Sequence, residues 1–146
     1  MIVVAPPTDI EANKMGFNIL ARAYEIFSFP FAGLGTSVRK IKEKPDQVKR
    51  VIKALIKANR FIRQNREEAI RALVEWAKVE PAVAATAYDS AIKVFSPDGS
   101  IPLDGLRLVI EQAKREAGIT RDIPFSEVAD LTFVREAQRE LGLKVR

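Results

Sequence analysis

The side chains available for chemistry are few in kind, because the 146 residues include neither histidine nor cysteine. Serine–histidine nucleophiles, imidazole acid–base catalysis, thiolate chemistry, zinc fingers and iron–sulfur ligation each need one of those two residues. Carboxylate, lysine and tyrosine chemistry remain. The lack of cysteine also means that thiol usage says nothing about the redox compartment.

Two pairs of carboxylates are candidates for acid–base work: Glu67 with Glu68, and Asp104 with Glu111. Adjacent carboxylates on one helix point apart, and in a first turn their interaction with the helix dipole is a sufficient explanation. Neither pair has a second converging group. We therefore predict that the chain is not an enzyme and has no catalytic residue, cofactor or metal site.

Positive charge is concentrated in residues 39–71, which hold twelve Lys/Arg and four Asp/Glu, a local charge of +8. Four of these cations, Lys49, Lys53, Lys57 and Arg60, line one face of a predicted helix. Such a face suggests an anionic partner such as nucleic acid. However, no aromatic residue is interleaved on it, so a solvated helix face is the favoured interpretation. A small basic interaction module that uses residues 39–71 stays as the alternative function.

Two apolar segments are candidates for the wall of a ligand cleft. Pro7 and Thr8 follow a predicted buried strand, where open α/β sheets place ligands and where a helix N-terminus can face an anion. Phe29 and Phe31 share one side of an extended segment. The predicted ligand-binding residues are thus Pro7, Thr8, Phe29 and Phe31. An ordinary strand end and helix cap, and simple core packing, are the competing explanations.

The chain is expected to form one domain with an α/β, mostly helical fold, in which residues 1–38 hold the short strands and one helix and residues 39–146 are helical. Apolar runs bounded by prolines and glycines predict strands at residues 2–5, 17–23 and 31–38, and a capped helix at 10–15. Gly33 and Gly35 lack the lysine and the third glycine of a phosphate-binding loop, so they are interpreted as hinge or bulge positions.

About five helices are predicted after residue 38. A long one runs from Pro45 to Asn65, and Asn65 then caps the next; Pro81 and Pro102 begin two more, and the last ends before Gly142. Apolar residues at spacings of three and four mark their inward stripes. In the long helix these are Val48, Val51, Ile52, Leu55, Ala58 and Ile62; in the later helices they are Ala84, Ala85, Tyr88, Ile92, Phe95, Leu106, Val109, Ile110, Ala113, Phe133, Val134, Ala137 and Leu141.

No run approaches the roughly 18 apolar residues of a membrane span. The first residues have no basic leader, and only five apolar residues precede Pro6 and Pro7, so no secretory signal is predicted. If Met1 is the true start, we expect the chain to stay in the cytoplasm.

Several short motifs, taken in their order along the chain, resemble the C-terminal half of periplasmic substrate-binding proteins of the nitrate/sulfonate/taurine type, a superfamily that includes thiamine-pyrimidine precursor synthases. The resemblance covers nearly the whole chain. The residues that carry it are Val3-Val4-Ala5-Pro6-Pro7, Gly16-Phe17-Asn18, Pro30-Phe31-Ala32-Gly33-Leu34-Gly35-Thr36-Ser37, Pro45-Asp46, Phe95-Ser96-Pro97-Asp98-Gly99, Val128-Ala129-Asp130 and Glu136-Ala137-Gln138 with Glu140-Leu141-Gly142.

The resemblance implies part of a type II periplasmic-binding-protein fold, with two lobes that close on a small anion or organic solute for the permease of an ABC importer. It implies a periplasmic or cell-envelope location. A family member is about twice as long, so this chain is expected to act as a truncated or partial solute-binding protein and, if expressed alone, to form a homodimer. The enzymes of the superfamily use a histidine and a cysteine-rich motif, and this sequence has neither residue type.

Overall fold

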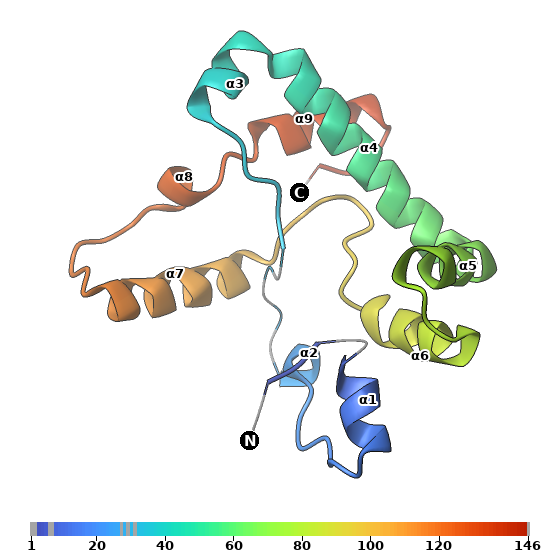
Figure 1. The fold of residues 1–146 in the computed structure, drawn as a ribbon. Helices are drawn as coiled ribbons and strands as arrows, with labels where there is room; N and C mark the ends of the chain where they lie inside the picture. Colours follow the sequence, from blue (N-terminus) through green and yellow to red (C-terminus); the bar gives the residue numbers. More distant parts are fainter. Residues whose placement is uncertain (1–2, 6–7, 27, 29, 31, 146) are drawn as a thin grey trace. The chain divides into compact units, whose positions relative to one another are not determined.

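The computed structural model describes residues 3–5, 8–26, 28, 30 and 32–145, and in these residues every regular element is an α-helix (Figure 1). The elements are α1 (Thr8–Lys14), α2 (Ala23–Ile26), α3 (Val38–Glu43), α4 (Pro45–Gln64), α5 (Arg66–Ala77), α6 (Pro81–Ala91), α7 (Leu103–Ala117), α8 (Phe125–Val128) and α9 (Thr132–Glu140). The described part of the chain is therefore all-α.

The predicted α/β class is wrong, because none of the three predicted strands forms in the described residues. Residues 3–5, 17–22 and 32–37 have no regular structure, Ala23 begins α2, and Val38 begins α3. A strand exists only when its backbone groups pair with a neighbouring strand. No described segment offers that pairing to residues 32–37, although Ser37 has the extended backbone of a strand (φ −79°, ψ 150°).

The helix predictions fare better where proline and glycine mark the ends. The long helix α4 begins at Pro45 and ends at Gln64, one residue before the predicted end, and Pro81 occupies the first turn of α6. Gly118 closes α7 in the left-handed conformation, with φ 66°. The short helices α2, α3 and α8 were not predicted. Helix α3 is capped by the Ser37 hydroxyl, which accepts a bond of 3.1 Å from the Lys40 N–H.

The chain divides into two compact units: Met1–Ile26 with Ala58–Phe95, and Phe27–Lys57 with Ser96–Arg146. We call them unit 1 and unit 2. The boundary between residues 57 and 58 falls inside the continuous helix α4. The single-domain organisation of residues 1–146 stays a prediction.

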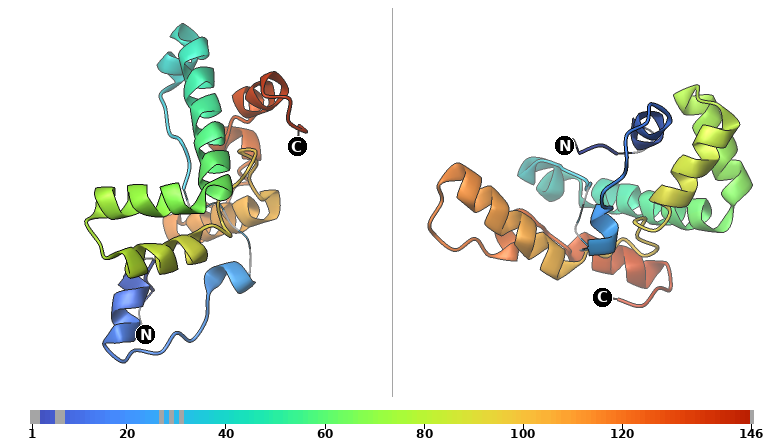
Figure 2. Two further views of the ribbon diagram at one scale, coloured as in Figure 1. Left: turned by 90° about the vertical axis from the view of Figure 1, so that its right-hand side faces the viewer. Right: turned by 90° about the horizontal axis from the view of Figure 1, so that it is seen from below.

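In unit 1, α5 and α6 lie side by side, as both views of Figure 2 show. The buried residues here are Ala84, Ala87 and Tyr88 of α6. The Tyr88 hydroxyl donates a 2.7 Å bond to the carbonyl of Ile62 at the end of α4, and Arg63 donates to the carbonyls of Ile92 and Phe95. These bonds satisfy carbonyls near helix ends and fix the position of α6.

The interior of unit 2 is small, and its buried residues belong to α4, α7 and α9. Its buried residues are Ile56, Leu106, Ile110, Ala137 and Gln138, together with Gly105. Of the predicted inward stripes, Leu106, Ile110 and Ala137 are buried as expected. Ile56 and Gln138 were not predicted to be inside. Val51, Leu55 and Val109 were, yet each is at least 40% exposed.

Candidate functional site

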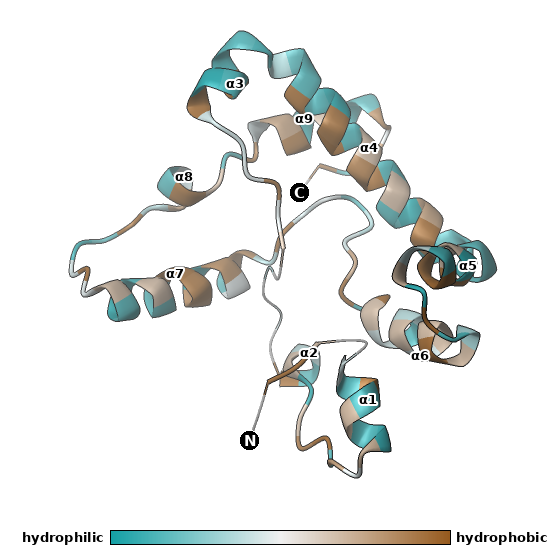
Figure 3. Cartoon of the chain, in the orientation of Figure 1, coloured by the Kyte–Doolittle hydropathy of each residue, from teal (hydrophilic) through white to brown (hydrophobic). Residues whose placement is uncertain are grey.

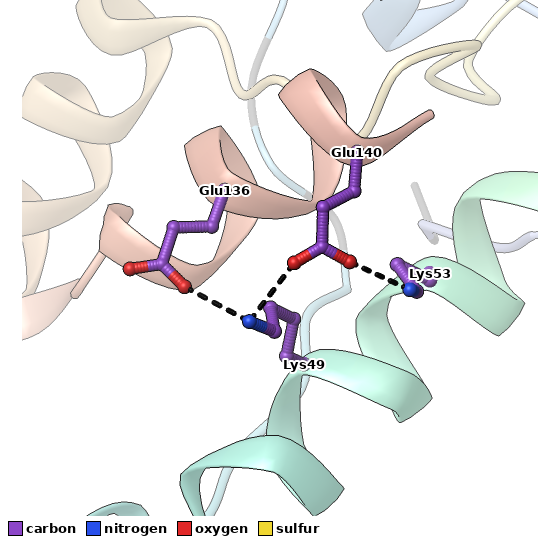
Figure 4. A network of polar contacts seen from close by, with 4 residues as sticks. All are labelled: Lys49, Lys53, Glu136 and Glu140. Atoms are coloured by element: carbon purple, nitrogen blue, oxygen red, sulfur yellow. Dashed lines mark hydrogen bonds and ion pairs between the residues drawn. The ribbon is translucent and has the colours of Figure 1, made fainter. Parts of the chain in front are cut away.

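A network of four charged side chains joins α4 to α9 within unit 2 (Figure 4). Lys49 Nζ lies 2.9 Å from Glu140 Oε1 and 3.4 Å from Glu136 Oε2, and Lys53 Nζ lies 2.7 Å from Glu140 Oε2. Residues four apart share a helix face, so one pair of lysines on α4 meets one pair of glutamates on α9. The two helices are thus joined by residues 87 positions apart in the sequence.

The network shifts the ionisation of its members in the directions expected for ion pairs. Hydrogen bonds from Lys53 and then Lys49 lower the pKa of Glu140 below its usual value. The hydrogen bond to Glu140 raises the pKa of Lys49. Both shifts favour the charged forms. Two of the four cations proposed to meet an anionic partner are therefore paired within the chain.

Two apolar side chains of α4, Val51 and Leu55, lie on the helix face opposite to Lys49 and Lys53 and are exposed. Ile56 is only 2% exposed and lies on the same side as Lys49 and Lys53, whereas Val51 and Leu55 are 46% and 43% exposed. Figure 3 shows apolar and polar residues alternating along α4 after its polar start. The usual surface helix buries its apolar stripe and exposes its lysines. Helix α4 instead directs two lysines toward α9 and leaves apolar residues uncovered.

The turn at residues 96–100 contacts both α4 and α9. The Asp98 carboxylate accepts bonds from the Ser100 hydroxyl (2.6 Å), the Ser100 N–H (3.0 Å) and the Ser96 hydroxyl (3.1 Å). The fully buried Gln138 side chain donates a 3.0 Å bond to the Asp98 carbonyl. This is an Asx-type turn, and its role is to satisfy buried polar groups.

A cleft of about 270 Å³ lies beside α7 in unit 2, lined by Arg107, Ile110, Glu111 and residues 122–125. The Arg107 guanidinium sits 5.5 Å from the centre of the Phe125 ring, and Glu111 pairs with Lys114 at 3.1 Å. Its volume is just below the roughly 300 Å³ at which small-molecule sites begin. Arg107 is engaged by an aromatic ring and Glu111 by a lysine, so the cleft is a weak candidate for a ligand site.

The residues predicted to bind ligand are only partly described. Thr8 is the first residue of α1, is exposed, and donates its N–H to the Ala5 carbonyl at 2.9 Å. Pro7, Phe29 and Phe31 lie outside the described residues. The grouping of these four residues at one cleft stays a prediction.

The carboxylate pairs considered for acid–base work do not form a reactive centre. Glu67 and Glu68 are exposed in the first turn of α5, and Glu111 is engaged by Lys114. Asp104 lies seven residues before Glu111, about 10 Å along the helix axis.

Within residues 3–5, 8–26, 28, 30 and 32–145, no group of three or more metal-ligating side chains could hold an ion. In the same part of the chain, no helix has the length and apolar character needed to cross a bilayer.

Comparison with known proteins does not place the chain in a family. No protein-family model, curated protein or solved structure matches it.

Sequence reasoning missed the acidic partners of the lysine face. Glu136 and Glu140 were noted only as parts of a motif, yet their i, i+4 spacing repeats that of Lys49 and Lys53. Complementary pairs with the same spacing on two helices are a signal of facing surfaces. That signal was available in the sequence, although spacing alone does not identify which helices meet.

Proposed function

We propose that this chain is the helical, non-catalytic part of a solute-binding protein for an ABC importer, in which it binds a small anion or small organic solute together with a second lobe. The proposal begins from the sequence motifs given above, chiefly residues 30–37 and 95–99. In the described residues, no group of side chains is arranged for catalysis. The further expectations are interaction with an ABC permease and a location in the periplasm or cell envelope.

The observation that carries the proposal is the outward apolar face of α4. Val51 and Leu55 are nearly half exposed, while Lys49 and Lys53 on the other side are paired with glutamates. These exposed valine and leucine side chains lie four residues apart on one helix face. Such a face favours coverage by another lobe or protein, because burial of apolar area is the main source of association free energy. A second lobe that packs on α4 would supply that cover.

The segment just before α3 supports the same interpretation. Backbone groups of residues 32–36 make no hydrogen bond to any described residue, and Leu34 is exposed. Backbone N–H and C=O groups that are covered by a neighbouring lobe are expected to form hydrogen bonds with it, because buried backbone groups are almost always paired. The uncovered segment and the outward face of α4 both belong to unit 2.

The test has two steps: sequence the DNA directly upstream of the Met1 codon, then purify this chain with the product of that region and titrate the pair with taurine, sulfate and nitrate by calorimetry. We expect a coding region for a first lobe, a complex with the chain, and saturable heat for at least one solute. An unrelated upstream gene, or a purified pair that gives no heat with any solute, would overturn the proposal.

If the chain is made alone, the uncovered apolar face favours a homodimer. Light scattering of the purified chain at micromolar concentration should then give twice the mass of 16.3 kDa. The matched variants are Val51→Ser with Leu55→Ser, which should yield a monomer, and Lys57→Ser, which should remain a dimer. A compact wild-type monomer would show that the apolar face does not self-associate.

A further inference from the structure

We propose that residues 34–44, comprising Leu34, Val38 and helix α3 with the lysine that follows it, form a docking surface for an anionic lipid bilayer. We call this segment the α3 surface. It is distinct from the apolar face of α4 and does not depend on the solute-binding role. Two features that lie together in unit 2 carry the inference: unpaired positive charge and exposed apolar side chains.

The charge comes from four cations within six residues: Arg39, Lys40, Lys42 and Lys44. All four are exposed, and none of them forms an ion pair with a carboxylate in the described part of the chain. Lys40 donates a 3.1 Å bond to the neutral side chain of Gln47 and keeps its charge. Figure 3 shows α3 and the start of α4 as the polar end of this region.

The lysines farther along α4 differ from these four. Lys49 and Lys53 are neutralised by Glu136 and Glu140, which leaves Arg50 and Lys57 as the α4 cations of unit 2 that form no ion pair in the described residues. Of the six cations in residues 39–57 that form no ion pair in the described residues, four therefore lie in α3 or directly after it. A cluster of four to eight Lys/Arg is the size that binds anionic lipid headgroups.

The apolar residues favour a bilayer as the partner. Leu34 and Val38 are 58% and 66% exposed and come directly before the cations in the sequence. In an interfacial segment, aliphatic side chains enter the headgroup and acyl boundary while lysines contact phosphates and carboxylates. A nucleic acid offers no aliphatic environment, and residues 32–44 contain no aromatic side chain on which a base would stack. The segment would lie on the bilayer without crossing it.

The experiment is co-sedimentation of the full chain with vesicles of phosphatidylcholine alone and of phosphatidylcholine with 30% phosphatidylserine, in 0.1 M NaCl. We expect binding only to the vesicles with phosphatidylserine, and loss of binding in 0.5 M NaCl, where the screening length is about 4 Å. The variant Lys40→Gln/Lys42→Gln/Lys44→Gln should lower the partition coefficient by roughly 100-fold, at about fivefold per lysine.

A matched variant removes three cations that are distant from α3 in the sequence and that form no ion pair in the described part: Lys57→Gln/Arg71→Gln/Lys78→Gln. It has the same net charge as the first triple variant and should bind within about threefold of the wild type, because it leaves the four cations of the α3 surface unchanged. Circular dichroism confirms that both variants fold. A third variant, Leu34→Ser/Val38→Ser, should weaken binding by about tenfold and leave its salt dependence unchanged.

Three outcomes would overturn the proposal. Absence of binding to the anionic vesicles excludes the bilayer as partner. Equal losses in the two triple variants would show that net charge, not the α3 surface, is responsible. If the chain binds a single-stranded oligonucleotide through Lys40, Lys42 and Lys44 and does not bind vesicles, the partner is a nucleic acid.

Discussion

Unit 1 and unit 2 are each stabilised internally by contacts of different range and chemistry. In unit 1, α6 buries two alanines and a tyrosine, its polar contacts join residues 23 to 32 positions apart, and it also contacts the N-terminal helix α1. In unit 2, α4 meets α9 through ion pairs that span 87 positions, and Gln138 reaches the turn 40 positions before it. The polar contacts around α6 therefore have a shorter range than those between α4 and α9, although each unit joins segments that are far apart in the sequence.

The difference has a consequence for stability. Closing a long loop costs more conformational entropy than closing a short one, and each contact in unit 2 must offset that cost. Unit 2 has only a few fully buried residues with which to do so. Substitutions in its interior should consequently have the largest effects, and should affect unit 2 more than unit 1.

Ile56→Ala should give the largest loss. Ile56 is 2% exposed and touches the turn at Gly99, so its truncation leaves a cavity and should lower the free energy of unfolding by roughly 2–5 kcal/mol. Urea unfolding followed by circular dichroism measures the loss. The neighbouring Leu55→Ala, at a half-exposed position, should cost less than half as much.

Hydrogen exchange of the same variant tests the independence of the two units. Amides of α9 and of residues 96–100 should exchange faster in Ile56→Ala, while those of α6 should keep the wild-type rates. Equal acceleration in α6 would mean that the two units unfold together. Their different contacts would then not give them different stabilities.

Gly99→Ala should have the next largest effect. Gly99 has φ +77°, and a Cβ atom there would lie 3.0 Å from Cγ1 of Ile56. The left-handed backbone alone costs an alanine roughly 1–2 kcal/mol, and the close approach adds to that. Gly142→Ala is the matched control, because Gly142 has φ +66° with no atom near the added Cβ. A larger loss for Gly99→Ala than for Gly142→Ala isolates the contact with Ile56.

Much of the helical part could be predicted, because the signals that end helices are local. Pro45, Pro81 and Gly118 lie at or next to ends of α4, α6 and α7, where fixed φ or a left-handed residue dictates the backbone. Ala84, Tyr88, Leu106 and Ile110 were expected inside from their spacing, and they are buried. These inferences need no knowledge of tertiary neighbours.

The strands and the orientation of α4 could not be predicted from local signals. Extended segments such as residues 32–37 become strands only with a hydrogen-bonded neighbour, which a pattern of apolar residues does not guarantee. The apolar residues of α4 extend around more than one face, so the pattern alone did not show whether Ile56 or Leu55 faces inward. Glu136 and Glu140 decide that question, and they lie about 80 residues later in the sequence.

Tyr88→Phe should have a smaller effect, confined to unit 1. The substitution removes only the hydroxyl that donates to the Ile62 carbonyl at 2.7 Å, and such a bond contributes about 0.5–1.5 kcal/mol. Tyr24→Phe is the control: the ring of Tyr24 faces the Lys93 ammonium at 5.2 Å, and phenylalanine keeps that ring. The urea midpoint of Tyr88→Phe should therefore be lower than that of Tyr24→Phe. Faster exchange in α9 than in α6 for Tyr88→Phe would contradict the separation of the units.

Glu140→Gln should have the smallest effect, and it should depend on pH and salt. Lys53 and Lys49 hold the pKa of Glu140 below its usual value of 4.5 in the folded chain. A carboxylate with a depressed pKa stabilises the fold above its unfolded pKa, and the contribution is lost as the pH falls through the folded value. The wild type should thus be slightly more stable than the variant at pH 7, and the difference should vanish as the pH is lowered well below 4.5.

The ion-pair network also predicts how that difference responds to salt, because exposed pairs are screened. In 0.5 M NaCl the gap between wild type and Glu140→Gln should shrink, and Glu75→Gln, at an exposed site without an ion pair in the described part of unit 1, should show no gap at either salt concentration. The sign is the decisive point: a variant more stable than the wild type at pH 7 would mean that desolvation of Lys49 and Glu140 outweighs their attraction. In that case the α4–α9 contact would rest on Ile56 and Val134, which both lie beside Gly99, and the charged network would only select which face of α4 turns inward.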